Sequence, residues 1–205
     1  MLIISNNCIG GFCYKFTHTI YNNPFMFTMT KFCDFVPLIT QPLNYGKFTL
    51  EKTDYECIKD KAFDIIVDNK VRIHFSHYRL YDKYESPTTI GINVYGKYIY
   101  KYVVEKYIER SKRLCQLHEP MTFALSWHPS SGTVSDLCRI AKLCESTNTK
   151  YVVITPQINE CNEIFDTIPS DNIITSPANV DGGWVENTAK QCYSNIIQKL
   201  TKGTL

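Results

Sequence analysis

The sequence predicts one α/β domain over residues 1–205, a three-layer α/β/α arrangement around a mostly parallel, Rossmann-like sheet. Three observations lead to this fold class. Short apolar runs alternate with helix-like segments, and nearly all of each run is apolar, which is typical of a parallel sheet covered on both faces. The hydrophobic content of 44% is enough for one sizeable core. A mixed or hairpin edge of the sheet is an open alternative.

The first third of the chain gives a strand, a helix and a hairpin. Residues 2–5 are the first expected strand, because this apolar run is bounded by turn-prone asparagines. Two glycines separate it from a helix over residues 12–16. Residues 28–43 look helical at first and then irregular around two prolines. Residues 62–77 alternate β-branched and aromatic side chains around a turn-prone Asp-Asn pair, which predicts a hairpin or bent strand ending at His77.

The rest of the chain continues the alternation of helices and strands. Apolar side chains recur at helical spacing in three segments, and Thr133 or Ser135 is a candidate cap for the second of them. Three short apolar runs between these segments predict strands. The expected helices span residues 95–117, 133–146 and 185–200, and the expected strands span residues 121–127, 150–155 and 172–176.

Charge and composition narrow the function classes. The 22 Lys and Arg and the 20 Asp and Glu are spread along the chain, so no basic stripe can follow a nucleic-acid backbone. No apolar run approaches the roughly 20 residues of a membrane-spanning helix. The chain opens on a strand-like run instead of a signal peptide, and its nine cysteines are scattered. We therefore expect a cytoplasmic protein with reduced thiols that neither binds nucleic acid nor spans a membrane.

The loop after the first strand is the expected chemical centre, because ligands gather at the carboxyl ends of parallel strands. Cys8 lies just before a helix N-terminus, where the helix dipole would lower the pKa of its thiol and make it a nucleophile. Asn6 and Asn7 could donate hydrogen bonds to an oxyanion, and Gly10 and Gly11 would let a ligand approach the backbone. The alternative for Cys8 is a small buried side chain, the usual state of a free cysteine.

Two histidines at other strand ends are candidate general bases, since neutral imidazole accepts a proton near pH 7. His77 is the first choice, with a half-buried structural histidine as the alternative. His128 is the second choice; it precedes a predicted helix, where anionic groups are favoured, and its neighbour Trp127 is a candidate substrate-binding residue. Tyr78 belongs to a run of tyrosines that could stack on sugar rings, although such residues more often serve packing. No nucleotide fingerprint is present, and no His or Cys spacing supports a metal site.

Three segments, taken in order, resemble a family found in exopolysaccharide and capsule gene clusters. They are residues 4–11 together with 21–25, residues 73–78, and a basic helix at residues 106–113. In the third segment Tyr107 stands where we expect Trp. The family resembles papain-like domains in layout, with an N-terminal Cys and a later His. It includes the viosamine N-acetyltransferase domain of a giant virus, mimivirus.

The resemblance implies a three-layer α/β fold and acetyl-CoA-dependent N-acetylation of an amino sugar or a nucleotide sugar. In a covalent route Cys8 would take the acetyl group with His77 as base. In a direct route His77 or His128 would deprotonate the sugar amine. Arg110 and Arg113 would pair with phosphates of CoA or of a nucleotide sugar, the alternative being a solvated helix face.

Two other function classes stay open. A papain-like cysteine hydrolase would use Cys8 and His77 with water as the acceptor. A non-catalytic glycan-binding or assembly module would rely on the tyrosines instead. A giant-virus source would put the chain in the host cytoplasm, and both a homodimer and membership of a longer glycosylation enzyme are open.

Overall fold

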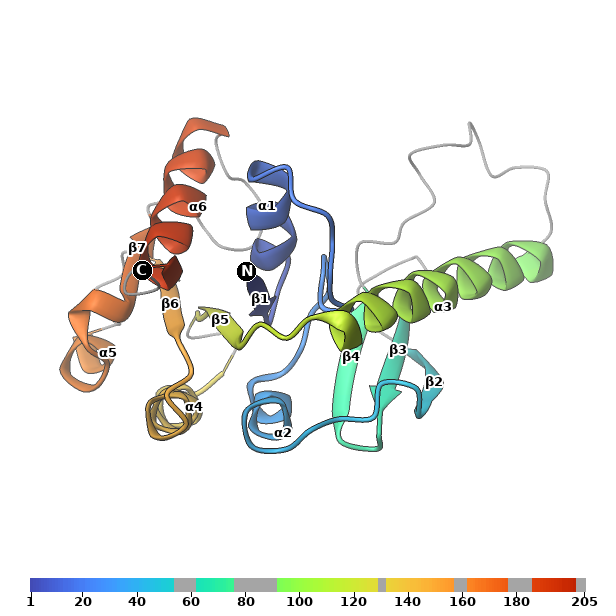
Figure 1. Ribbon diagram of the computed structural model, residues 1–205, viewed down its shortest axis with the longest axis horizontal. Coiled ribbons are helices and arrows are strands. Elements are labelled where there is room, and N and C mark those ends of the chain that lie inside the picture. The colour runs from blue at the N-terminus through green and yellow to red at the C-terminus, as the bar shows by residue number, and fades with distance from the viewer. Residues whose placement is uncertain (54–61, 76–91, 129–131, 157–161, 177–185, 202–205) are drawn as a thin grey trace.

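The structure is a computed structural model, shown in Figure 1. It describes residues 1–53, 62–75, 92–128, 132–156, 162–176 and 186–201. Two of the expected site residues, His77 and Tyr78, lie outside the described residues.

Four parallel strands form the main sheet, in the order β1-β5-β6-β7. They are β1 (Leu2–Ser5), β5 (Met121–Ser126), β6 (Tyr151–Pro156) and β7 (Ile173–Ser176). Each strand was predicted from its apolar run. The runs are almost continuously apolar because both faces of the sheet are covered, and the mostly parallel sheet is confirmed.

Helices cover both faces of this sheet, and Figure 1 shows α1 and α6 above the strands and α2 and α4 below them. Side chains of β1 alternate between two cores: Ile3 packs in the cluster of α1 and α6, whereas Leu2 and Ile4 pack in the cluster of α2 and α4. The predicted three-layer α/β/α arrangement is therefore confirmed. The helices are α1 (Ile9–Phe16) and α6 (Glu186–Thr201) in one layer, and α2 (Phe35–Thr40), α4 (Val134–Ser146) and α5 (Asn162–Thr167) in the other.

The predicted hairpin is part of a separate three-stranded antiparallel sheet, in the order β2-β3-β4. Its strands are β2 (Phe48–Thr53), β3 (Ala62–Val67) and β4 (Val71–Phe75). Asp68 and Asn69 make the turn between β3 and β4 with positive φ angles of 51° and 54°, which suits these two residue types. The hairpin thus belongs to its own sheet and is not an edge of the parallel one.

The longest helix, α3 (Ile92–Gln116), packs on the antiparallel sheet. The ring of Tyr107 contacts the ring of Phe48 on β2, with centroids 4.7 Å apart, and its hydroxyl donates a hydrogen bond to the carbonyl of Tyr45. Both sheets share one hydrophobic cluster with α2, α3 and α4. Among the described residues, none of the helices combines the length and the apolar character needed to cross a membrane.

Residues 28–30 join the two sheets, although the sequence predicted a helix there. Met29 forms an antiparallel bridge with His74 of β4, with two hydrogen bonds of 2.8 Å, and the N–H of Thr30 donates to the carbonyl of Asn6 at 2.8 Å. This pairing requires extended backbone, so the helical prediction for the start of residues 28–43 was wrong. The helical backbone begins only at the 3-10 turn Phe32–Asp34, which leads into α2.

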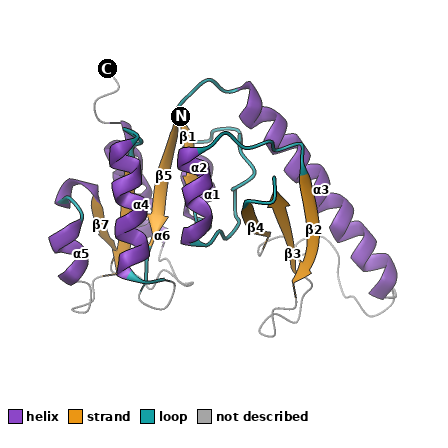
Figure 2. Ribbon diagram, turned by 90° about the horizontal axis from the view of Figure 1, so that it is seen from below, coloured by secondary structure: helices purple, strands orange, loops and turns teal. Residues whose placement is uncertain are grey.

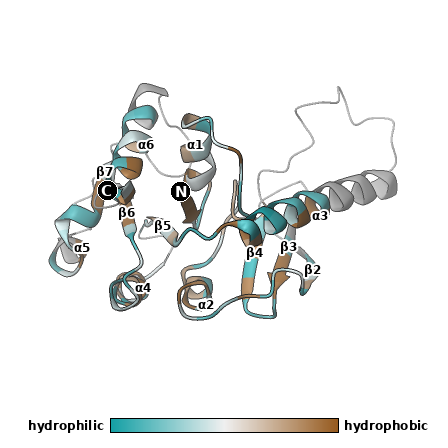
Figure 3. Ribbon diagram, viewed as in Figure 1, coloured by the Kyte–Doolittle hydropathy of each residue, from teal (hydrophilic) through white to brown (hydrophobic). Residues whose placement is uncertain are grey.

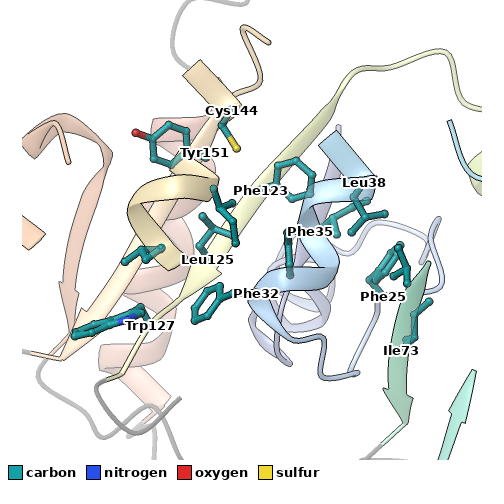
Figure 4. Close-up of a cluster of buried hydrophobic side chains, with 14 of the residues drawn as sticks. Phe25, Phe32, Phe35, Leu38, Ile73, Phe123, Leu125, Trp127, Cys144 and Tyr151 are labelled. Atoms are coloured by element: carbon teal, nitrogen blue, oxygen red, sulfur yellow. The ribbon is translucent and has the colours of Figure 1, made fainter. Parts of the chain in front are cut away.

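Aromatic side chains fill the core between the parallel sheet and the layer of α2 and α4. Figure 4 shows Phe35 and Phe123 facing each other, with Phe32 between α2 and Trp127. The rings of Phe35 and Phe123 meet edge to face with centroids 5.3 Å apart. In Figure 3, which colours the ribbon by hydropathy, hydrophobic residues are concentrated on strands such as β1 and β3.

Candidate functional site

Asn6 holds the carboxyl ends of β1 and β5 together. Its Nδ2 donates to the carbonyl of Ser126 at 2.8 Å, and the N–H of Ser126 donates to its Oδ1 at 2.7 Å. The amide group that the sequence nominated as an oxyanion donor is thus engaged with main-chain groups 120 residues away. As a result, residues 6–8 and residues 126–128 lie at the same edge of the parallel sheet.

Asn7 stabilises the beginning of α1. Its Oδ1 accepts hydrogen bonds from the N–H of Ile9 at 3.0 Å and from the hydroxyl of Ser5 at 3.2 Å. The first amide groups of a helix have no partner within the helix, so a side-chain oxygen at this position stabilises the helix start. Asn7 lies one residue before the N-cap residue Cys8, and its contacts stabilise the start of α1, whereas the sequence suggested an oxyanion donor.

Gly10 and Gly11 lie inside α1, whereas the sequence predicted them in a loop that admits a ligand. A Cβ atom at Gly10 would lie 3.0 Å from the Cβ of Ser5 on β1. A Cβ atom at Gly11 would lie 2.9 Å from three atoms of the Phe27 ring. Both glycines are buried and allow α1 to pack closely on its neighbours. Close approach to the protein itself accounts for both glycines, and close approach to a ligand stays a prediction.

Cys8 directly precedes α1 and is partly buried. Burial raises the pKa of its thiol to about 12, and a backbone hydrogen bond offsets only part of this effect. The expected lowering of this pKa by the helix N-terminus is therefore wrong, because loss of hydration outweighs the favourable dipole. The thiol is neutral at physiological pH.

Trp127 and His128 follow β5 at the same edge. Trp127 is 2% exposed and packs in the core beside Phe32, as Figure 4 shows, so little of its surface is left for a substrate. Its Nε1 is buried and has no hydrogen-bond partner within the described part of the chain. His128 is partly buried and makes an electrostatic or hydrogen-bonded contact. Since His77 lies outside the described residues, its expected proximity to Cys8 stays a prediction.

Arg110 and Arg113 of α3 bind the loop between α1 and the antiparallel sheet. Arg110 is 7% exposed; it donates to the carbonyl of Met26 at 3.1 Å and lies over the ring of Tyr21. Arg113 donates to the carbonyl of Tyr21 at 2.7 Å and pairs with Glu109. These contacts account for both arginines without a bound phosphate. Arg110 is buried, so its side chain is not part of a solvated helix face.

A pair that the sequence did not nominate lies on the antiparallel sheet. The Nδ1 of His74 on β4 is 2.7 Å from Oδ1 of Asp64 on β3, and both side chains are largely buried. Oδ2 of Asp64 accepts a hydrogen bond from Arg72 at 2.7 Å. The sequence did contain a signal for this pair, because a hairpin turn at residues 68–70 sets residues 64 and 74 opposite each other. We call His74, Asp64 and Arg72 the hairpin charge cluster.

The structure offers no metal centre in the part of the chain that it describes, since no three His, Cys, Asp or Glu side chains converge there. The seven cysteines within that part are all free thiols: Cys8, Cys13, Cys33, Cys115, Cys138, Cys144 and Cys192.

Residues 1–90 match the model of a family described as a domain of unknown function, DUF1919. The match includes the loop after β1, the loop that Arg110 and Arg113 bind, and the hairpin charge cluster. It ends before α3. The description of the family names no activity. No curated protein matches the chain.

Proposed function

We propose that this chain transfers the acetyl group of acetyl-CoA directly to the amine of an amino sugar or nucleotide sugar, as part of glycan biosynthesis. The observation that carries the proposal is the pair of hydrogen bonds between Asn6 and Ser126, which holds the residues before α1 and the segment that leads to His128 at one edge of the sheet. Ligands of parallel α/β sheets gather at such an edge. The resemblance to the exopolysaccharide family, which rests on residues within the DUF1919 match and on α3, supplies the reaction class.

The state of Cys8 favours direct transfer over a covalent acetyl-enzyme. Because burial raises the pKa of this thiol to about 12, the neutral thiol predominates over the thiolate at pH 7. Nucleophilic attack on a thioester requires that thiolate. The same argument weakens the cysteine-hydrolase alternative, which needs the same nucleophile.

Direct transfer needs two proton steps and no metal. The sugar ammonium first gives one proton to an imidazole of the site, which leaves a neutral amine. The amine nitrogen then forms a bond to the acetyl carbon, the C–S bond breaks, and its electron pair goes to sulfur. The remaining excess proton on nitrogen passes to the CoA sulfur. The products are the amide, CoA thiol and one proton released to solvent from the imidazole.

Incubation of the full chain with acetyl-CoA and a panel of amino-sugar nucleotides tests the proposal, with mass spectrometry of the sugar as the readout. We expect an increase of one acetyl group on at least one acceptor. Cys8→Ala should retain most of the rate, because the direct route makes no bond to sulfur. A matched Cys33→Ala variant, at an exposed thiol, controls for the general effect of losing a cysteine.

Three outcomes would contradict the proposal. Absence of acetylated product with every acceptor would contradict the proposed transferase activity. Sugar binding without turnover would then favour the glycan-binding module. Loss of activity in Cys8→Ala together with an acetylated wild-type protein would restore the covalent route. Release of CoA without an acetylated sugar would favour the hydrolase.

A further inference from the structure

Large hydrophobic side chains gather on the outer side of α1. Six such side chains are exposed in the part of the chain that the structure describes, and three of them, Phe12, Phe16 and Ile20, lie within nine residues. Their exposed fractions are 37%, 38% and 70%. Single exposed hydrophobic residues are ordinary on a protein surface, whereas a group of them marks an interaction site. We call Phe12, Phe16, Ile20 and the exposed Lys15 between them the aromatic face.

The two phenylalanine rings of the aromatic face are held by other aromatic side chains. The ring of Phe12 stacks on Tyr193 of α6 with centroids 5.8 Å apart, and it meets Phe27 edge to face at 5.3 Å. The ring of Phe16 contacts the same tyrosine, with centroids 6.2 Å apart. Figure 1 shows α1 and α6 side by side on one side of the parallel sheet. Because the rings are already fixed by these contacts, binding a partner costs little side-chain entropy.

The sequence leaves this layer of the molecule nearly free of acidic residues, although about one residue in ten of the whole chain is acidic. Residues 1–33 contain no Asp or Glu, and they include Lys15 and Lys31. In α6, Glu186 at the first position is the single acidic residue, against Lys190 and Lys199. Even if Glu186 and Lys190, one turn apart, are counted as a neutral pair, the excess charge of the two helices is positive.

Carboxylates on the neighbouring elements lie beside cations. Glu109 on α3 pairs with a lysine and an arginine of the same helix. Glu119 pairs with the amino group at the start of β1. Lys199 donates to the carbonyl of Asp171, which places its ammonium group beside that residue. These three carboxylates are therefore offset by cations, and Lys15 adds a further positive charge within the aromatic face.

An anionic lipid surface fits an apolar face with a positive charge inside it. Aromatic and aliphatic side chains enter the headgroup region of a bilayer, and lysines are attracted to anionic headgroups. A second copy of the chain fits less well, because a two-fold symmetric contact brings the same positive face onto itself. A nucleic acid requires a row of cations that follows its backbone, and the aromatic face carries one lysine.

We propose that the aromatic face attaches the protein to the surface of an anionic membrane. Phe12, Phe16 and Ile20 then lie in the headgroup region, and Lys15 lies against the lipid phosphates. Attachment of this kind requires no membrane-spanning helix. The inference goes beyond the proposed acetyl transfer and does not depend on it.

Co-sedimentation of the full chain with lipid vesicles tests the inference. The wild type should bind vesicles made of equal parts phosphatidylglycerol and phosphatidylcholine, and should bind pure phosphatidylcholine vesicles about 10-fold or more weakly. Lys15→Glu should lower the partition coefficient on the anionic vesicles about 10-fold or more, because one lysine near such a surface contributes a factor of about five and the new carboxylate is repelled. Lys142→Glu is the matched control, an exposed lysine of α4 in the opposite layer, and it should bind like the wild type.

A second pair of variants tests the apolar part of the face. Ile20→Ser should weaken binding to the anionic vesicles several-fold at an unchanged melting temperature, since this side chain is 70% exposed, whereas the control Ile108→Ser on α3 should not. Failure of the wild type to bind, equal binding to both kinds of vesicle, or full binding by Lys15→Glu overturns the inference. So does a wild-type dimer in sedimentation velocity that Ile20→Ser dissociates, because the face would then bind a second copy.

Discussion

At the scale of single residues, the Gly11 contact shows how the sequence of α1 serves packing. A Cβ at this position would lie 2.9 Å from the ring of Phe27, well inside ordinary contact distance. That ring cannot move aside easily, because it meets Phe12 and Tyr21 edge to face with centroids 5.3 and 5.5 Å away. A well-packed site of this kind tolerates an added methyl group poorly.

Gly11→Ala should therefore destabilise the protein by about 1 kcal/mol. Overpacking costs about 1–3 kcal/mol, and the better helix propensity of Ala recovers up to about 1 kcal/mol of that. Unfolding in urea measures the free energy of unfolding of the variant and of the wild type. Gly46→Ala is the control, since its Cβ would meet only a side-chain oxygen at 3.3 Å in an exposed turn. Equal stability of Gly11→Ala and the wild type would show that the Phe27 ring moves aside at no cost in free energy.

At the scale of elements, α3 holds the loop between α1 and the antiparallel sheet through its arginines. Arg110→Met keeps the length and apolar body of the side chain but removes the donor to the carbonyl of Met26 and the contact with Tyr21. We expect a loss of about 1.5–3 kcal/mol in the free energy of unfolding, the range for a hydrogen bond from a charged group.

The matched control for Arg110→Met is Lys112→Met, two residues along α3 and exposed. Its free energy of unfolding should lie within about 0.5 kcal/mol of the wild type. The two variants remove the same charge from the same helix, so a difference between them measures the loop contacts. Equal effects of the two variants on the free energy of unfolding would mean that the contacts of Arg110 with the loop contribute no stability. The interpretation of Arg110 as a phosphate ligand would then stay open.

At the scale of the whole molecule, local patterns predicted the parallel sheet and the helices that cover it. The strands β1, β5, β6 and β7 are continuous apolar runs, which require a doubly covered sheet. β2 was missed because its charged residues break the apolar pattern, and α5 because six residues carry too few periodic positions. Contacts between residues that are far apart in the sequence leave no local pattern, so they were not predicted.

The candidate site illustrates the same limit. No local signal joins Asn6 to Ser126, because 120 residues separate them. The sign of the Cys8 pKa shift depends on burial, which spacing does not reveal. The contact between Asp64 and His74 was within reach, since it follows from the register of one hairpin.

The connection between the two sheets depends on residues 28–30, and a proline tests it. Thr30→Pro removes the N–H that donates to the carbonyl of Asn6 and leaves the Met29 bridge to His74 in its extended form. We expect a loss of about 1–3 kcal/mol in the free energy of unfolding, because the carbonyl of the partly buried Asn6 loses its donor.

Lys31→Pro is the control for this prediction, since Lys31 already has φ at −67°, the angle that a proline ring imposes. It should change stability little. Hydrogen exchange adds a readout at the site itself: in Thr30→Pro the N–H of Ser126 should exchange faster, because it donates to the side chain of the Asn6 that the proline releases. If exchange at Ser126 stays unchanged while stability falls, the antiparallel sheet and the carboxyl edge of the parallel sheet are independent.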